Sequence, residues 1–336
     1  MTQTFEIAVI GATGTVGETL VQILEELEFP VGTLYLLAGS NSAGASVPFR
    51  GKNVRVKEVD TFDFSKVQLA FFAAGPAVTL SFAPRATAAG CAVIDLSGAL
   101  PAEQAPQVVP QANAHVLDGL KKPFQLGSPS PCATYLAVVL APLRGVVDIQ
   151  RVSVTANLAI SAQGREAVSE LARQTAELLN VRPLEPAFFD RQVAFNLLAQ
   201  VGTPDAQGHT ALEKRLVHEL RAVLETPLLK ISATCVQAPV FFGDSLTVSL
   251  QLAAPVDLAA VNRALEAAPG IELVEEGDYP TAVGDAVGQD VVYVGRVRAG
   301  IDDPAELNLW LTSDNVRKGS ALNAVELAQL LIKGLV

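Results

Sequence analysis

The chain has 336 residues, which at roughly 100–200 residues per domain predicts two domains and excludes a single small module. Its 24 Lys and Arg against 35 Asp and Glu give a net charge of −11 with no basic run, which argues against nucleic acid and against an anionic membrane surface as partners. No apolar stretch reaches the ~20 residues that cross a bilayer, no signal peptide begins the chain, and three Cys and three His lack metal-ligand spacing, so we expect a cytoplasmic protein without a metal.

The first hundred residues alternate short apolar runs with helical patterns. Strand followed by helix in repetition is typical of a parallel, doubly wound sheet, and therefore of an α/β domain of the Rossmann type. The strands are expected at residues 6–10, 34–38, 69–73 and 92–95, and the helices at 16–27 and 77–89.

From about residue 149 the strands become longer and fewer helices separate them. This pattern favours an antiparallel or mixed sheet with helices on one face, in a second domain of the α+β class. We expect strands at residues 151–156, 229–236, 245–252, 291–297 and 306–312, and helices at 166–179, 211–224 and 258–267. Apolar residues at helical spacing over 321–332 predict one more amphipathic helix at the C-terminal end.

A glycine loop follows the first predicted strand and opens the first helix. Its sequence is Gly11-Ala12-Thr13-Gly14-Thr15-Val16-Gly17. Glycines allow a tight turn and a close approach of the backbone to a pyrophosphate, whose charge then lies on the free N–H groups of the helix N-terminus. The strand before it and the helix after it are the context that this mechanism needs. We therefore predict a nucleotide site with Gly11, Gly14 and the hydroxyl groups of Thr13 and Thr15; a plain tight turn is the alternative.

The second predicted strand ends in a stretch without a carboxylate, Ala38-Gly39-Ser40-Asn41-Ser42-Ala43-Gly44. Dinucleotide-binding folds usually place an acid there to bind the ribose hydroxyls. Its absence permits a 2′-phosphate, but the stretch has no Arg to hold one. The sequence therefore leaves NADP and NAD both open.

Cys132 lies in Ser128-Pro129-Ser130-Pro131-Cys132-Ala133-Thr134, directly before a helical run. A helix N-terminus favours the thiolate, so Cys132 is a candidate nucleophile. The alternative is a small buried apolar residue, which is how we interpret Cys91 and Cys235.

Several segments together resemble the aspartate-semialdehyde dehydrogenase family over essentially the whole chain. They include IAVIGATGTVG, LLAGSNSAG, SPSPCAT, ISAQGREAV, DAVGQDVVYVGRVR and LNLWLTSDNVRKGSALNAVELA. The resemblance implies an amino-acid biosynthetic oxidoreductase that reduces aspartyl phosphate with NADPH through a thioester on a cysteine. It also implies a dinucleotide-binding domain, residues 1–128 with 319–336, and a catalytic and dimerisation domain, 129–318. Further cofactor contacts are implied at Val16, the loop Ser40, Asn41 and Ser42, Gly75 and Asn315.

The nucleophile position of the family is filled by Cys132, but the other active-site positions depart from its pattern. The family's glutamine falls at Leu158, its substrate-binding arginine at Gln237 and its acid/base histidine at Asp244. Its glutamate and lysine pair falls at Leu212 and Arg215. The family's arginine of the phosphate pocket is Pro101, and that of the cofactor loop is Asn41. These replacements remove the anion contacts and the proton carrier.

A carboxylate at position 244 should repel a thiolate at Cys132 and raise its pKa. We therefore expect a divergent member of the family, a homodimer that binds NADP or NAD and is weak or inactive on aspartate semialdehyde. Two alternatives remain open. One is a non-catalytic binding or scaffold protein, and the other is a reductase of a different, less anionic acyl substrate, with Leu158 and Gln237 lining its pocket.

Overall fold

The computed structural model describes residues 3–335, which form two compact units. One consists of the chain up to Ser130 together with the residues from Ser320 onward, and the other is Pro131–Gly319. Within residues 3–335 no helix has the length and apolar character needed to span a membrane. The same residues contain no group of three or more His, Cys, Asp or Glu placed to hold a metal ion.

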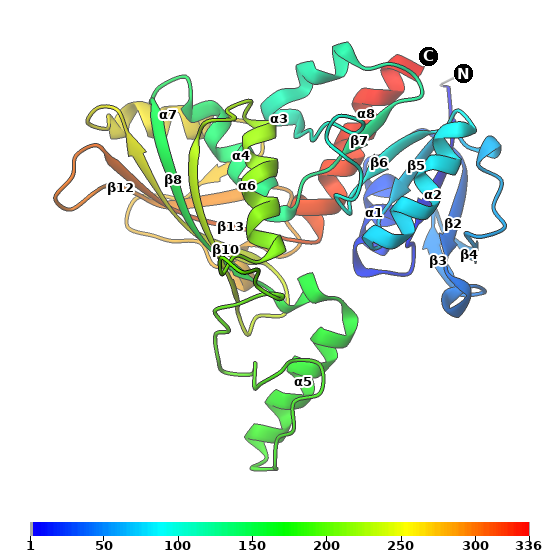
Figure 1. The fold of residues 1–336 in the computed structure, drawn as a ribbon, viewed down its shortest axis with the longest axis horizontal. Coiled ribbons are helices and arrows are strands. Elements are labelled where there is room, and N and C mark those ends of the chain that lie inside the picture. Colours follow the sequence, from blue (N-terminus) through cyan, green and yellow to red (C-terminus); the bar gives the residue numbers. More distant parts are fainter. Residues whose placement is uncertain (1–2, 336) are drawn as a thin grey trace. The chain divides into compact units, whose positions relative to one another are not determined.

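The first unit is built on a seven-stranded sheet in the order β3-β4-β2-β1-β5-β6-β7 (Figure 1). All neighbouring strands are parallel except β3 and β4, which form a hairpin. The parallel α/β sheet that the alternating pattern predicts is confirmed. The strands are β1 Phe5–Ile10, β2 Val31–Ala38, β3 Ser46–Phe49, β4 Lys52–Glu58, β5 Leu69–Phe72, β6 Ala92–Asp95 and β7 Gln125–Gly127.

Helices cover both faces of this sheet because its central strands are apolar on both sides. Helices α1 (Thr15–Glu26) and α8 (Asn323–Leu335) share one buried cluster with alternate residues of β1, such as Ile7 and Val9. Helix α2 (Pro76–Ala88) packs on the other face, against Ala8 and Ile10. A short helix, α3 (Pro110–Asn113), lies beside α8. This packing holds the glycine loop between β1 and α1 at the carboxyl ends of the parallel strands.

The second unit contains a six-stranded mixed sheet in the order β11-β12-β13-β10-β8-β9. Its inner strands are antiparallel, whereas β8 and β9 are parallel, as are β11 and β12. Helices α4, α6 and α7 pack beside one another against it, with α4 in the middle. The elements are α4 Pro131–Leu143, β8 Ile149–Leu158, α6 Ala211–Val223, β9 Lys230–Gln237, β10 Asp244–Leu252, α7 Leu258–Ala267, β11 Ile271–Leu273, β12 Val292–Ala299 and β13 Glu306–Ser313.

Period-two alternation decides which face of this sheet is buried. Along β10 the residues Leu246, Val248 and Leu250 are fully buried, and the Ser and Thr residues between them are on the other face. Helix α4 is almost entirely buried and apolar, as expected for a helix that is enclosed by a sheet and two further helices. The mixed sheet with helices on one face is therefore as predicted.

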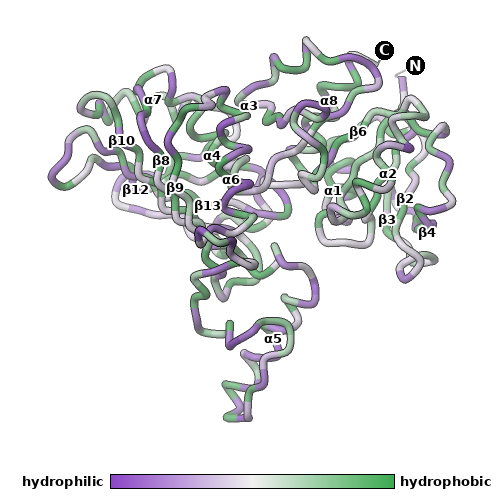
Figure 2. Tube along the Cα trace, viewed as in Figure 1, coloured by the Kyte–Doolittle hydropathy of each residue, from purple (hydrophilic) through white to green (hydrophobic). Residues whose placement is uncertain are grey.

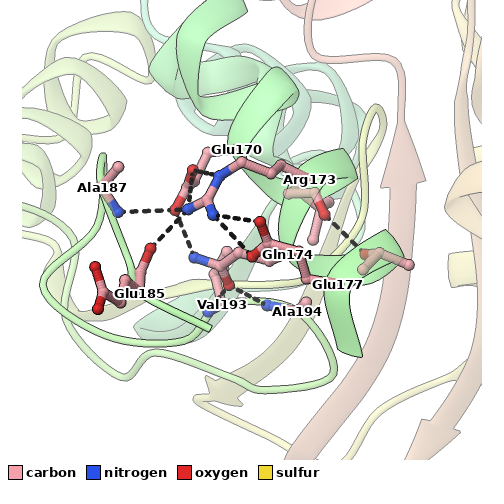
Figure 3. A network of polar contacts seen from close by, with 10 residues as sticks. Glu170, Arg173, Gln174, Glu177, Glu185, Ala187, Val193 and Ala194 are labelled. Atoms are coloured by element: carbon pink, nitrogen blue, oxygen red, sulfur yellow. Dashed lines mark hydrogen bonds and ion pairs between the residues drawn. The ribbon is translucent and has the colours of Figure 1, made fainter. Parts of the chain in front are cut away.

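Residues 160–203, which we call the α5 segment, form a small substructure of the second unit around α5 (Arg165–Leu179). The helix carries both hydrophobic and hydrophilic residues along its length (Figure 2). Its apolar side packs against Val193, Ala194 and Leu198 from the chain that returns toward β9. Gln174 Oε1 accepts hydrogen bonds from the N–H groups of Val193 (2.8 Å) and Ala194 (3.2 Å) (Figure 3). One buried amide thus fixes the course of the returning chain.

Candidate functional site

Four residues meet at one edge of the second sheet, where β8 and β9 end and β10 begins. Leu158 pairs with Gln237 across the parallel strands, and Asp244 pairs with Ser313 of β13. Ser245 pairs with Asn157, so Asp244 and Leu158 are neighbours on adjacent strands. We call Gln237, Leu158, Asp244 and Ser313 the strand-end row. Strand pairing thus brings Leu158 next to Gln237 and Asp244, which lie about 80 residues later in the sequence, and these three are the positions of the row that differ from the family pattern.

Cys132 lies in the first turn of α4 and contacts this row through Asp244. Its Sγ is 3.7 Å from Asp244 Oδ2, and both side chains are buried. The other carboxyl oxygen, Oδ1, accepts a hydrogen bond from the N–H of Ala159 at 2.9 Å. Pro131 is tolerated at the start of α4 because the N–H that it lacks has no partner within a helix at that position.

Burial and the neighbouring carboxyl group both disfavour a thiolate at this site. The pKa of the Cys132 thiol is raised well above its ordinary value, first by burial and second by the charge of Asp244. Burial also raises the pKa of Asp244 from 3.8 to about 7, against the opposing effect of the Ala159 N–H. From the sequence we expected the charge of Asp244 to raise the pKa of Cys132, and in the structure burial is the larger cause.

Asn315 supports the turn that leads into Asp244. Its Oδ1 accepts the N–H of Gly243 at 3.0 Å, and its Nδ2 donates to the hydroxyl oxygen of Ser161, also at 3.0 Å. Gly243 adopts a φ of 86°, a region that favours glycine. Asn315 was predicted as a cofactor contact. The structure gives it these partners within the second unit, and the cofactor role stays a prediction.

Gln237 is buried and is held in one orientation by the backbone of its neighbour. Its Nε2 donates to the carbonyl oxygen of Leu158 at 2.7 Å. Its Oε1 is buried and accepts no hydrogen bond from any of the residues that the structure describes. A carbonyl oxygen can receive only a donor, so the amide nitrogen must face Leu158 and the amide oxygen must face away.

Arg215 lies on α6, which packs against α4 and β9. Its Nε donates to Oε1 of Glu219, one turn further along the helix, at 2.7 Å. Glu213, which follows Leu212 directly, forms a capping box with Thr210 at the start of α6. Its carboxylate also accepts a hydrogen bond from the N–H of Cys235. Glu213 therefore has a structural role at the helix start, and the catalytic role of Arg215 remains a prediction.

In the first unit the glycine loop has the geometry of a close backbone approach. Gly11 has a φ of 87°, and a Cβ on it would lie 2.7 Å from the carbonyl oxygen of Ala73. A Cβ on Gly17 would overlap the carbonyl oxygen of Gly11. Gly14 is the N-cap of α1 and supplies no side-chain cap, so the first N–H groups of the helix, from Thr15 onward, have no side-chain acceptor there. Such a turn is suited to an anion.

The other predicted cofactor residues of this unit lie at the ends of neighbouring elements. Ser40, Asn41 and Ser42 form a short 3-10 turn after β2, and Gly75 is the N-cap of α2, again with no side-chain cap. The stretch from Ala38 to Gly44 itself contains no Arg. The structure brings Arg55 of β4 beside it, because a Cβ on Gly44 would be 3.9 Å from the Arg55 guanidinium.

Tyr135 is a further residue of the candidate site that we did not predict from the sequence. It follows Cys132 by three residues on α4, which places both on one face of the helix. Its hydroxyl is buried with no hydrogen-bond partner among the described residues, and burial, followed by the charge of Asp244, raises its pKa. The helical spacing from Cys132 was the available signal.

Comparisons with known proteins agree with this architecture. The family model "Semialdehyde dehydrogenase, NAD binding domain" matches residues 6–120, and "Semialdehyde dehydrogenase, dimerisation domain" matches residues 140–318. A relative from Azotobacter vinelandii, called USG-1 protein homolog, is 60% identical over 333 residues and 99% of each chain. Aspartate-semialdehyde dehydrogenase 2 from Vibrio cholerae is 40% identical over 334 residues, again 99% of each chain.

A solved structure has the same fold throughout. The structure of a probable aspartate-semialdehyde dehydrogenase from Pseudomonas aeruginosa is 58% identical, with a TM-score of 0.97 over 99% of this chain and 100% of the other. The resemblance inferred from the sequence motifs is confirmed, and so are the nucleotide-binding type of the first sheet and the dimerisation type of the second domain. The chain therefore belongs to the aspartate-semialdehyde dehydrogenase family.

Proposed function

We propose that this protein is a divergent, dimeric member of its family that binds NADP or NAD but turns over aspartate semialdehyde poorly or not at all. One observation carries the proposal: Cys132 is buried 3.7 Å from the carboxyl group of Asp244. A nucleophilic cysteine needs a thiolate, and both burial and the carboxyl charge oppose it.

The first unit supports binding of a dinucleotide. Close backbone contacts at Gly11 and Gly17 leave no room for a Cβ, and the helix start at Gly14 leaves N–H groups without a side-chain acceptor. We propose that the N–H groups of Thr15 and Val16 and the hydroxyl group of Thr13 hold the pyrophosphate. A bound nicotinamide dinucleotide would supply the chemistry of hydride transfer. Gly75 and the loop Ser40–Ser42 belong to the same proposed site.

The second unit supports only a reduced acid/base capacity. Asp244, with a pKa of about 7, could hold a proton at Oδ2 near Cys132 Sγ, but it carries no positive charge when protonated. A protonated histidine would stabilise a neighbouring thiolate by its positive charge, whereas a carboxyl group is neutral when protonated and repels a thiolate when ionised. General acid/base assistance is worth about 10²–10⁴ in rate, which is the loss that we expect from this replacement alone.

The side chains at the expected substrate-binding positions are also poor partners for the carboxylate of aspartate semialdehyde. Leu158 has no polar group, and Gln237 offers an amide oxygen where a carboxylate would need a cation. A buried carboxylate without a charged partner is costly, so aspartate semialdehyde should bind weakly. Arg215 remains the proposed cation of the site, although Glu219 already forms an ion pair with it.

The dimer is proposed to form through the second unit. Its match to a dimerisation domain supports this, as does the sheet face opposite the buried residues of β10. That face carries the half-buried residues Ser245, Ser249 and Trp310. The three helices α4, α6 and α7 pack on the opposite face, so they do not cover these residues. Light scattering at micromolar concentration should give the mass of a dimer, and a monomer mass would contradict this part of the proposal.

The proposal is tested by binding and turnover together. Calorimetry with NADP and NAD should show binding, and oxidation of aspartate semialdehyde should be slower than that of the Vibrio cholerae relative by at least about 10²–10⁴. The variant Asp244→His alone should not restore full activity, because Gln237 and Leu158 remain. Turnover by the unmodified chain at the rate of that relative would overturn the proposal.

A further inference from the structure

The chain passes between its two compact units twice, and the first passage comes directly before Cys132. One passage is the bond between Ser130 and Pro131, and the other is the bond between Gly319 and Ser320. Cys132 is therefore the second residue of the second unit and lies in the first turn of α4. Whatever fixes the chain at its entry into this unit also fixes the position of the thiol.

Within the second unit, the residues next to the two passages pack closely against each other. A Cβ placed on Gly319 would lie 2.5 Å from the hydroxyl oxygen of Tyr135 and 2.6 Å from the Cβ of Pro131. Real side chains do not approach other atoms so closely, so only a residue without a side chain fits at position 319. The backbone of Gly319 thus lies directly against the first turn of α4.

Within the first unit, the same two stretches of chain are joined by hydrogen bonds. Nδ2 of Asn323, the buried first residue of α8, donates to the hydroxyl oxygen of Ser128 at 2.8 Å. It also donates to the carbonyl oxygen of Val108 at 3.3 Å. Each unit therefore ties the entering stretch to the leaving stretch on its own side of the passages.

The stretch that leads to Gly319 has fixed hydrogen-bond partners. Oδ1 of Asp314 accepts the N–H of Val316 at 2.9 Å and that of Arg317 at 2.8 Å, and its Oδ2 accepts the N–H of Gly288 at 2.8 Å. The N–H of Gly319 itself donates to the carbonyl oxygen of Asp314 at 2.9 Å. Gly319 cannot move away from α4 without loss of these bonds, so it forms a fixed wall for the first turn of the helix.

Tyr135 fills the space beside this wall. Its side chain is fully buried, and its hydroxyl has no hydrogen-bond partner among residues 3–335. A buried hydroxyl without a partner lowers stability, so hydrogen bonding does not account for this side chain. Its contribution is packing: it lies on the same face of α4 as Cys132, one turn away, and joins that turn to Gly319.

We propose that Tyr135 and Gly319 are positioning residues for Cys132, which fix the first turn of α4 and keep the thiol in contact with the carboxyl group of Asp244, 3.7 Å away. The inference rests on the proposed function, in which this buried contact disfavours the thiolate. It assigns the low reactivity of the thiol to the packing at the entry into the second unit as well as to the carboxylate. Opening this packing should make Cys132 more reactive even though Asp244 remains.

The test is alkylation of the full chain by iodoacetamide as a function of pH, read by mass spectrometry at each thiol. Tyr135→Ala removes the ring and leaves space beside the first turn of α4, so the burial of Cys132 decreases. We expect the midpoint of Cys132 to fall by at least about one unit, which is a tenfold faster reaction at a given pH below the midpoint. Gly319→Ala should act in the same direction, because its Cβ must displace Tyr135 or Pro131.

Controls separate positioning from a general loss of stability. Tyr135→Phe keeps the ring and removes only the hydroxyl, so it should not lower the melting temperature and should keep the native midpoint of Cys132. Leu143→Ala removes a fully buried side chain at the other end of α4, and should lower the melting temperature without shifting that midpoint. Cys91 and Cys235 are also buried and are internal references, whose alkylation should stay slow in every variant.

The inference is overturned if Tyr135→Ala and Gly319→Ala leave the midpoint unchanged, or if Leu143→Ala shifts it equally. It is also overturned if all three thiols react faster together, because the change is then global unfolding. A shifted midpoint in Tyr135→Phe would assign the effect to the hydroxyl and contradict the packing account. If either alanine variant does not fold, Tyr135→Leu, which also lacks the ring, decides the question.

The same measurement distinguishes this inference from the proposed function. A native midpoint of Cys132 below the free-thiol value of about 8.5 would refute the proposed function, and this inference with it. A high native midpoint that none of the variants at Tyr135 and Gly319 shifts would refute this inference alone.

Discussion

Replacing Asp244 with Asn would separate its charge from its shape. The amide oxygen of Asn can still accept the N–H of Ala159, and its nitrogen can donate toward Cys132 Sγ. Only the ability to ionise is lost. Because the pKa of Asp244 rises from 3.8 to about 7 in the folded chain, the native state binds a proton that the unfolded state releases between those values.

The sign and size of the effect follow from this pKa. A group with a raised folded pKa stabilises the native state fully below its unfolded value, and that contribution disappears as the pH rises to the folded value. Between pH 5 and pH 8 the loss at Asp244 is about 3 kcal/mol, at 1.36 kcal/mol per unit of pKa. The stability of Asp244→Asn relative to the native chain should therefore increase by about 3 kcal/mol over this range, or roughly 5–10 °C in melting temperature.

The assay is thermal unfolding of both proteins at pH 5 and pH 8, at equal concentration. Asp302→Asn, an exposed carboxylate of the same unit, is the matched control and should show the pH dependence of the native chain. If Asp244→Asn and the native chain respond equally to pH, Asp244 does not carry a raised pKa. That result would contradict the burial to which we attribute the raised pKa of both Asp244 and Cys132.

Three further outcomes test other parts of the structure. Gly14→Val should lower the affinity for either dinucleotide by at least about tenfold in calorimetry, because a branched side chain would occupy the pyrophosphate space; unchanged affinity would make the loop a plain turn. Gln174→Leu leaves the N–H groups of Val193 and Ala194 without an acceptor, costs about 1–3 kcal/mol for each, and should speed hydrogen exchange over 185–198, whereas unchanged exchange would contradict the network. Arg55→Gln should weaken NADP but not NAD, and equal effects on both would exclude a contact with the 2′-phosphate.

The elements of regular structure could be predicted where hydrophobic periodicity is strong. The helix expected at 258–267 and the strand at 92–95 have those bounds in the structure. The β3 and β4 hairpin was missed because β4, Lys52–Glu58, has only two apolar residues among seven and lies next to the sheet edge. β4 is a strand because it pairs with β2, and this pairing cannot be read from the sequence of β4 alone.

The candidate site could be predicted in its residues but not in its environment. The resemblance pointed to Cys132 and Asp244, and the structure gives the 3.7 Å contact between them. That burial outweighs charge in raising the thiol pKa depends on the closed packing of α4, which no motif encodes. The orientation of Gln237 depends on a carbonyl group 79 residues away, which β8 and β9 bring together only by pairing.

The pH dependence of alkylation at Cys132 tests the central claim most directly. Iodoacetamide labelling of the native chain, resolved by mass spectrometry to each of Cys91, Cys132 and Cys235, gives the titration of each thiol. We predict a midpoint for Cys132 well above the free-thiol value of about 8.5, shifted downward in Asp244→His but not to neutrality, because burial remains. A native midpoint below about 8.5 would mean that Cys132 is activated, and would contradict the account of a chain that has lost the chemistry of its family.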